Sequence, residues 1–285
     1  MNGILLVDKP EDWTSHDVVA KLRGILKERR IGHSGTLDPM ATGLLVVFVG
    51  RATRAVEFAE SDKKSYTAGL RLGTVTDTMD TTGNIHSDKD CSVPIEELNA
   101  ALHGFRGNIE QIPPMYSAIK IGGKKLYELA RRGQEIERKP RNVTIYELEA
   151  KGSGRDYTLK ICCSKGTYIR SLCNDIGESL GCGGCMSSLR RTKAGIFSVE
   201  NALSLTEIEN AENREALLMP VDSLFSDRPE CVINSDMEKK CRNGNYFAVD
   251  VSDGEYRVYS ESGEFLMLGE VKNKTAKVIK SFFEV

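Results

Sequence analysis

The chain has 285 residues, with 39 lysine and arginine against 41 aspartate and glutamate residues, and 40% of its residues are hydrophobic. This is the composition of an ordinary globular protein, which excludes disorder, collagen and a coiled coil. The longest uncharged apolar stretch, residues 39–50, is much shorter than the roughly 20 residues that a bilayer requires. The N-terminus lacks the basic segment of a signal peptide. We therefore predict a cytoplasmic protein with no membrane partner.

The N-terminal part of the chain is predicted to alternate strands and helices. Residues 3–8 are predicted to form a strand, and Ser15 is predicted to cap a helix whose apolar residues recur with a 3.6-residue period. Residues 32–43 are punctuated by glycine and proline and are predicted to form a loop. The valine-rich run 44–49 is typical of a buried strand, and a further strand is predicted over 65–72.

The middle of the chain continues this mixture. A helix is predicted over 94–103, with a proline near its start. Two strands are predicted over 142–149 and 157–163, because a glycine-rich turn separates them. A helix over 167–180 is expected to end at a glycine, and the helical pattern continues to about residue 225.

The C-terminal tail is β-rich. From about residue 230, turn pairs separate apolar runs, and these pairs are Asn243-Gly244, Asp253-Gly254 and Ser262-Gly263. The pattern predicts two domains, a main one of residues 1–228 and a small β domain of residues 229–285.

The charge is divided unevenly between the two ends of the chain. Residues 1–197 hold 29 basic and 24 acidic residues, whereas residues 198–285 hold 10 basic and 17 acidic residues. Eight of the basic residues lie within 120–141, together with three glutamates. Such a cluster is typical of a phosphate-binding face or of a plain solvated surface. Charge alone therefore favours a nucleic-acid partner only slightly.

The eight cysteines contain one tight pair, Cys182 and Cys185. A four-ligand zinc site needs a second pair or nearby histidines, and the four histidines all lie far upstream. We therefore predict no metal and free thiols, and a zinc or redox protein is the last of the alternatives.

Residues 33–43 form the loop in which we place the chemistry, since loops on a rigid scaffold carry most active sites. Its one carboxylate is Asp38, which precedes a proline, and Gly35 and Gly43 permit unusual backbone angles. An aspartate before proline is more often a turn former than a catalyst. The loop by itself therefore indicates only a candidate site.

The loop belongs to a series of segments that run in order over residues 3–225. They are Val7-Asp8-Lys9-Pro10, Thr14-Ser15, His33 to Arg54, Lys64-Ser65-Tyr66, Leu72-Gly73, Thr76 to Asp80, Pro113 to Ala118, Gly123 to Arg131, Ser164 to Arg170 and Leu189-Arg190-Arg191. The series resembles the bacterial tRNA pseudouridine-55 synthases, the TruB family. The opening motif departs from the family at Asp12, where glycine is usual, and the tail resembles a PUA-type β domain.

The resemblance implies an isomerase that converts uridine-55 in the T loop of tRNA to pseudouridine by base flipping, with no cofactor. It implies an α+β fold: a pseudouridine-synthase-like mixed, largely antiparallel sheet with flanking helices, plus a small PUA-like RNA-binding domain. The expected partners are the T loop and acceptor stem of tRNA. The chain is expected to act as a monomer, with an accessory role in tRNA folding.

The resemblance also assigns roles to particular residues. Asp38 matches the catalytic aspartate, and Arg170 matches the arginine that pairs with this carboxylate and keeps it ionised. The residues that match substrate-binding positions are His33, Tyr66, Tyr168 and Leu189. Lys9 and Pro10 match a motif that supports the site. The sequence leaves open whether Asp38 acts as a nucleophile or as a base.

Two alternatives share part of this prediction. The first keeps the fold and chemistry but uses a guide-RNA complex, as the archaeal and eukaryotic relatives do. The second is a non-catalytic RNA-binding or RNA-folding factor, which would be expected to lack Asp38 or Arg170, and both residues are present.

Overall fold

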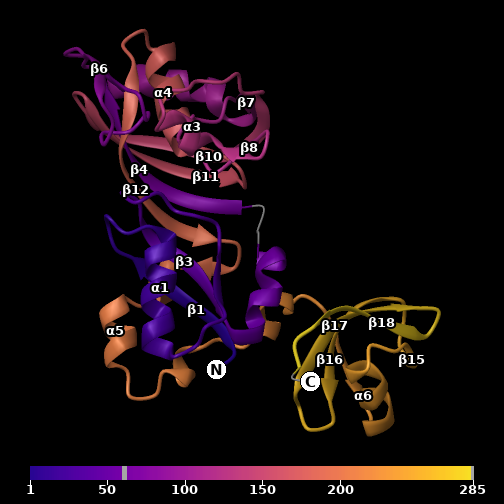
Figure 1. Ribbon diagram of the computed structural model, residues 1–285. Helices are drawn as coiled ribbons and strands as arrows, with labels where there is room; N and C mark the ends of the chain where they lie inside the picture. Colours follow the sequence, from indigo (N-terminus) through magenta and orange to yellow (C-terminus); the bar gives the residue numbers. More distant parts are fainter. Residues whose placement is uncertain (60–62, 284–285) are drawn as a thin grey trace.

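The computed structural model describes residues 1–59 and 63–283 and shows an elongated molecule (Figure 1). Its main body is a mixed sheet of nine strands in the order β1-β3-β12-β4-β11-β10-β7, with β2 beside β3 and β13 beside β12. The strands are β1 (Gly3–Lys9), β2 (Ile31–Ser34), β3 (Thr42–Val49), β4 (Lys63–Leu72), β7 (Gly107–Gln111), β10 (Arg141–Ser153), β11 (Asp156–Ser164), β12 (Gly184–Ala194) and β13 (Phe197–Ser198).

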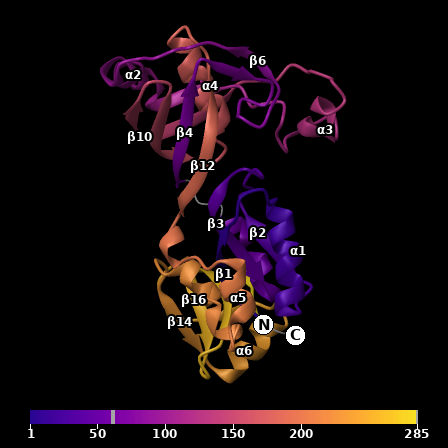
Figure 2. The same cartoon turned by 90° about the vertical axis from the view of Figure 1, so that its left-hand side faces the viewer.

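The sheet is largely antiparallel. The exception among its described pairs is β3 with β12, which run parallel, with Arg190 opposite Thr42 and Arg191 opposite Gly43. The long strands β4 and β12 lie side by side, and β12 continues from the upper part of the molecule toward the lower part (Figure 2). The loop that carries Asp38 joins β2 to β3, so it lies where β12 meets β3.

Successive side chains of a strand point to opposite faces of the sheet. Both faces carry apolar residues here, and helices pack on them. In the lower half, Leu5 and Val7 pack on α1 (Ser15–Leu26), with α5 (Leu205–Asn210) beside it. Ile4 and Leu6 belong to the cluster on the other face, which includes the 3-10 helix η1 (Gly50–Ala59). In the upper half, α2 (Ile95–Leu102) and α4 (Ile169–Ser179) pack on the sheet.

Several smaller elements lie outside the main sheet. Two hairpins, β5 (Thr74–Thr76) with β6 (Ile85–Asp88) and β8 (Lys120–Ile121) with β9 (Lys124–Lys125), lie outside the main sheet. The second hairpin leads into the short helix α3 (Leu126–Ala130). The remaining 3-10 helices are η2 (His103–Phe105), η3 (Val199–Asn201), η4 (Glu215–Leu217) and η5 (Val221–Phe225).

The tail forms a separate five-stranded sheet in the order β14-β16-β17-β18-β15. Its strands are β14 (Glu230–Ile233), β15 (Phe247–Ala248), β16 (Gly254–Ser260), β17 (Phe265–Lys272) and β18 (Thr275–Ser281), and it also contains a helix α6 (Ser235–Arg242) that the sequence pattern did not predict. Phe265 and Phe282 of this unit pack against Phe225, so the tail shares a hydrophobic cluster with the main body.

Three sequence predictions are wrong. Residues 32–34, predicted as the start of a loop, form most of β2 and pair with β3. Residues 184–194, predicted as helix, form β12, because two register irregularities interrupt the two-residue alternation that would have indicated a strand. The cap of α1 is Thr14 rather than Ser15. The Thr14 hydroxyl accepts from the Asp17 amide, and Asp17 accepts from the Thr14 amide in return.

In the described part of the chain, no helix is both long and apolar enough to span a bilayer.

Candidate active site

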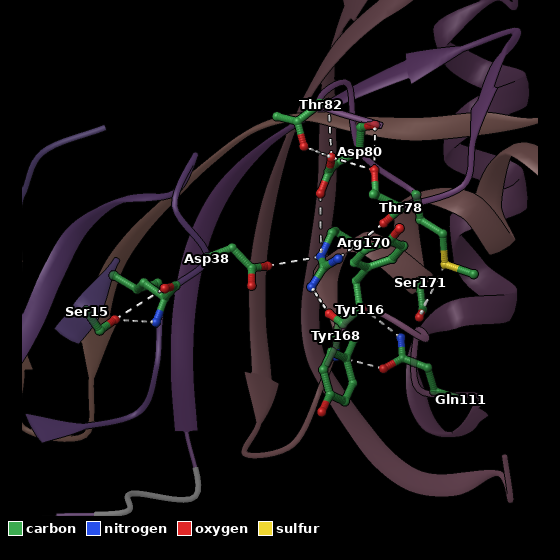
Figure 3. Close-up of polar contacts among 12 residues, drawn as sticks. Ser15, Asp38, Thr78, Asp80, Thr82, Gln111, Tyr116, Tyr168, Arg170 and Ser171 are labelled. Carbon is green, nitrogen blue, oxygen red and sulfur yellow. Dashed lines mark hydrogen bonds and ion pairs between the residues drawn. The ribbon is translucent and has the colours of Figure 1, made fainter. Parts of the chain in front are cut away.

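Asp38 lies in a loop that is fixed to the body on both sides of the aspartate. The Ser15 hydroxyl accepts from the Leu37 amide at 2.9 Å and donates to the Leu37 carbonyl at 3.2 Å. The Asp38 carbonyl accepts from the Ala41 amide at 3.0 Å. Ser15 thus connects the loop to the first turn of α1, which is the role that this residue has in place of the predicted cap (Figure 3).

Lys9 joins the opening motif to the same loop. Its side chain is fully buried, and its ammonium donates to the carbonyls of Pro10, Trp13 and Pro39 at 2.8, 2.6 and 3.0 Å. Burial lowers the pKa of Lys9 to about 8, although the nearby Asp12 and Asp38 carboxylates oppose this shift. Pro10 contributes its carbonyl, and its ring is exposed. Lys9 thus links the opening motif to the loop through Pro39, and Pro10 contacts Lys9 through its carbonyl.

The departure at Asp12 has a clear structural basis. This residue has φ of 61°, in the left-handed region where glycine is usual and aspartate is tolerated. Asp12 therefore adopts the left-handed turn conformation that glycine would be expected to provide at this position.

Asp38 and Arg170 form the ion pair that the sequence predicted. Arg170 lies in the first turn of α4, and its Nε is 3.0 Å from Oδ2 of Asp38 (Figure 3). The Arg170 side chain is 6% exposed and that of Asp38 is 39% exposed, so the carboxylate is open on one side. The other guanidinium nitrogens donate to the carbonyls of Thr78 and Tyr116 at 3.2 and 2.8 Å. All three guanidinium nitrogens therefore have a partner, which fixes the orientation of the group.

Asp80 is the site residue that sequence reasoning missed. Its Oδ2 lies 3.7 Å from Nε of Arg170, and its side chain is 6% exposed. Oδ1 accepts from the Thr78 hydroxyl at 2.8 Å and from the Thr82 amide and hydroxyl at 3.0 and 2.6 Å (Figure 3). Asp80 lies in one of the matching segments, but nothing in that segment distinguishes it from Asp77. Only the fold shows that two carboxylates, those of Asp38 and Asp80, meet the same nitrogen of Arg170.

The ionisation of Asp38 reflects opposing influences. Burial raises the pKa of Asp38 above its ordinary value, and the Asp80 carboxylate acts in the same direction. Arg170 and, more weakly, Lys9 favour the charged form and oppose this shift. The carboxylate is therefore a stronger base than an exposed aspartate while a fixed cation contacts it.

Three of the predicted substrate-binding residues line the same region. Tyr66 on β4 and Leu189 on β12 are each 8% exposed, and they share a hydrophobic cluster with Leu37 and Met40 of the loop. Tyr168 is the N-cap residue of α4 and is half-buried, two positions before Arg170. The Gln111 side chain fixes the Tyr168 backbone through bonds of 2.7 and 2.9 Å.

His33 lies at the other side of the loop, on β2. Its ring makes an edge contact with His16, with centroids 5.9 Å apart, and its buried Nδ1 has no hydrogen-bond partner among residues 1–59 and 63–283. Burial lowers the pKa of His33, and the neighbouring His16 and Arg191 add to the shift. His33 is therefore held neutral at the margin of the site.

The cysteines are all free thiols. Cys185 is fully buried, whereas the Cys182 thiol interacts with that of Cys91 from a distant segment. Among the described residues, no group of three or more His, Cys, Asp and Glu side chains is arranged to hold a metal ion.

Comparison with known proteins agrees with this geometry. Residues 23–169 match the profile of the TruB family pseudouridylate synthase N-terminal domain, and residues 170–226 match that of the tRNA pseudouridylate synthase B C-terminal domain. A tRNA pseudouridine synthase B of Clostridium kluyveri is 43% identical over 99% of this chain and all of its own length. One of Lachnoclostridium phytofermentans is 45% identical over 96% of each chain.

Solved structures share the fold. The chain superposes on a protein of a Cbf5-Nop10-Gar1 complex with a TM-score of 0.73 and 27% identity, over 99% of this chain and 85% of that one. A chain of an H/ACA particle bound to a substrate RNA with 2′-deoxyuridine superposes with a TM-score of 0.73. The two chains are 25% identical, and the coverage of each chain is the same as in the first comparison.

The mixed sheet is thus the scaffold of the pseudouridine synthases, a class of isomerases. Within this class, the chain belongs to the TruB family.

Proposed function

We propose that this enzyme isomerises uridine-55 in the T loop of tRNA to pseudouridine. The observation that carries the proposal is the Asp38–Arg170 ion pair, in which the carboxylate stays open on one side while the arginine is fixed. The names of the relatives, tRNA pseudouridine synthase B, support tRNA as the substrate.

The reaction exchanges one bond to the sugar for another. The bond from C1′ to N1 of the uracil breaks, the base turns, and C1′ bonds to C5. The proton on C5 leaves to water, and N1 gains a proton, so no cofactor is required by the balance. We propose that Asp38 acts on the nucleoside as an ionised carboxylate, as nucleophile or as base.

The nucleotide must leave its stack to reach Asp38, at a cost of a few kcal/mol. We propose that Tyr66, Tyr168 and Leu189 contact the flipped base, since one aromatic stacking contact contributes roughly 1–3 kcal/mol. His33 fills the space that the base leaves in the RNA. Lys9 and Pro10 support the loop through the carbonyl contacts described above.

We further propose that residues 1–228 form the catalytic domain and that residues 229–285 form a PUA-like domain that binds the acceptor stem. The enzyme would act as a cytoplasmic monomer. Six basic residues of the tail are candidates for phosphate contacts, and they are Lys239, Lys240, Arg242, Lys274, Lys277 and Lys280. Four of them form ion pairs with acidic neighbours: Lys239, Arg242, Lys274 and Lys280. The other two, Lys240 and Lys277, are therefore the first residues to replace by glutamate when the salt dependence of tRNA binding is measured.

The central test uses unmodified tRNA that carries tritium at C5 of uracil. The wild-type protein is expected to release tritium with no added factor. Asp38→Asn should abolish release and leave tRNA binding intact, because the change keeps the shape of the side chain. Asp156→Asn, which alters an exposed carboxylate, is the matched control and should retain activity. Tritium release by Asp38→Asn would remove Asp38 from catalysis.

A second candidate function is guided modification, because the structural matches include chains from H/ACA particles. Under this alternative, the isolated protein would bind tRNA and release no tritium. Turnover by the protein alone excludes it. The expected role in tRNA folding is separable, since inactive Asp38→Asn should still accelerate the refolding of tRNA.

A further inference from the structure

Arg191 is a buried cation that donates hydrogen bonds to two backbone carbonyls and also interacts with the Tyr66 phenol. It lies on β12 and is 1% exposed. Its Nε donates to the Leu44 carbonyl at 2.7 Å, and one terminal nitrogen donates to the Gly35 carbonyl at 2.9 Å. A buried charge is costly unless it is well hydrogen-bonded. An apolar residue would fill this place at lower cost if filling were its only purpose.

The two carbonyls belong to opposite ends of the Asp38 loop. Gly35 begins the loop and Leu44 follows it in β3, so one guanidinium ties both ends together. A Cβ atom at Gly35 would lie 3.1 Å from the guanidinium of Arg191, and one at Gly43 would lie 2.4 Å from the Arg191 carbonyl. Both glycines have positive φ, 73° and 95°. The loop therefore closes tightly around this arginine.

The same side chain also reaches Tyr66. Arg191 is the direct cross-strand partner of Tyr66 in the β12–β4 pair, and the guanidinium interacts with the phenol. On the opposite edge of β12, which pairs with β3, Arg191 lies opposite Gly43. Arg191 thus contacts three parts of the structure: β4 at Tyr66, β3 at Leu44, and the start of the Asp38 loop at Gly35.

We propose that Arg191 is a positioning residue that fixes the Asp38 loop relative to the Tyr66 ring. It is too deeply buried to contact RNA, so it acts through the residues that do. Its planar guanidinium donates in several fixed directions, which a lysine ammonium on a flexible stem does not reproduce. This inference rests on the proposed function only for its effect on turnover.

The test compares Arg191→Lys and Arg191→Ala with Arg190→Lys. Arg190 is the neighbouring arginine on the same strand, is 42% exposed and pairs with Asp8 at 2.7 Å. Arg191→Lys should slow single-turnover isomerisation by about 10²-fold, the effect expected of a small misplacement in a catalytic site. The tRNA affinity should change by no more than about two-fold, because the loss falls on the chemical step. Arg190→Lys should retain the wild-type rate.

Chemical rescue separates positioning from mere stability. Methylguanidinium should enter the space left in Arg191→Ala and restore the single-turnover rate, whereas methylammonium should not. Recovery of the thermal midpoint without recovery of the rate would overturn the proposal. A wild-type rate in Arg191→Lys, or an equal loss of affinity and rate, would overturn it as well.

One readout does not depend on the substrate. In free Arg191→Lys, hydrogen exchange of the Leu37 and Ala41 amides should be faster than in the wild type, and in Arg190→Lys it should be unchanged. If the wild type releases no tritium from tRNA, the proposed function fails, and this exchange comparison still decides the role of Arg191. Unchanged exchange in Arg191→Lys would contradict the inference.

Discussion

Asp38 lies in a field of opposing charges, and this arrangement decides its protonation. Nε of Arg170 contacts the Asp38 carboxylate at 3.0 Å, while the Asp80 carboxylate lies 3.7 Å from the same nitrogen. The two carboxylates share one cation, so neither is fully compensated. Asp80 therefore positions Arg170 and also makes Asp38 easier to protonate.

This arrangement predicts the pH at which activity is lost on the acid side (the acid limb) of the pH–activity profile. Because burial and Asp80 raise the pKa of Asp38 above its ordinary 3.8, kcat/KM should fall with decreasing pH earlier than for an exposed aspartate. Activity is present above the raised pKa and is lost as the pH falls through it. Asp80→Asn removes a negative charge and should move the acid limb to lower pH, with a lower plateau because Arg170 loses a partner. A limb that moves to higher pH would contradict this electrostatic account.

Single residues also show what the sequence could and could not predict. Asp38, Arg170 and the tyrosines stand out because their segments resemble a family. Asp80 did not stand out in the sequence, because what places it in the site is its contact with Arg170, a residue far away in the chain. The cap of α1 was misplaced by one residue, because Thr14 and Ser15 are both good capping residues and only geometry separates them.

At the scale of elements, the important unit is the β2–β3 connection with β12 beside it. Ser15, Lys9 and Arg191 fix the loop at Leu37, Pro39 and Gly35 in turn. A loop fixed at alternate residues presents its one carboxylate, that of Asp38, in a constant direction, which is what preorganised catalysis requires.

The tight approach of β3 and β12 gives a stability prediction. Gly43→Ala should lower the free energy of unfolding by more than about 1 kcal/mol, because φ is 95° and the new Cβ would meet the Arg191 carbonyl at 2.4 Å. Gly24→Ala is the matched control, since Gly24 lies in α1 with nothing within 4 Å of a new Cβ. It should raise the free energy of unfolding by about 0.5–1 kcal/mol. Urea unfolding measures both, and equal effects would refute the steric argument.

The strand β12 shows why part of the fold was not predictable. Its register is interrupted between Met186 and Ser188 and again between Arg191 and Lys193. Each irregularity shifts the side-chain alternation by one residue, so the hydrophobic pattern loses its period of two. By contrast, β3 has a continuous apolar run, and the prediction of a buried strand there is confirmed.

At the scale of the whole molecule, the tail is attached through a shared core. Phe265 and Phe282 stack with centroids 5.2 Å apart, and both pack near Phe225 of the main body. Lys280 pairs with Glu57 of η1, and Arg54 donates to the Ser281 carbonyl at 3.1 Å. A deletion of residues 230–285 would expose this cluster, so point substitutions are better tests of the tail.

Phe282→Ala should therefore destabilise more than the tail. Phe282 is 3% exposed, and its removal should cost about 3–5 kcal/mol in the free energy of unfolding. Ile196→Ala changes a residue that is 65% exposed and should cost less than about 0.5 kcal/mol. Differential scanning calorimetry checks both. A loss in Phe282→Ala that is confined to a separate transition of the tail would show that the cluster does not couple the two parts.

The place of β12 in the sheet has a consequence for synthesis. This strand lies between β3 and β4, which are far earlier in the chain, and it supplies the arginine around which the loop closes. Before residue 184 has been synthesised, the edges of β3 and β4 that β12 later covers have no partner, and such edges pair with other chains when left uncovered. The loop that carries Asp38 can therefore close around Arg191 only after β12 has been synthesised.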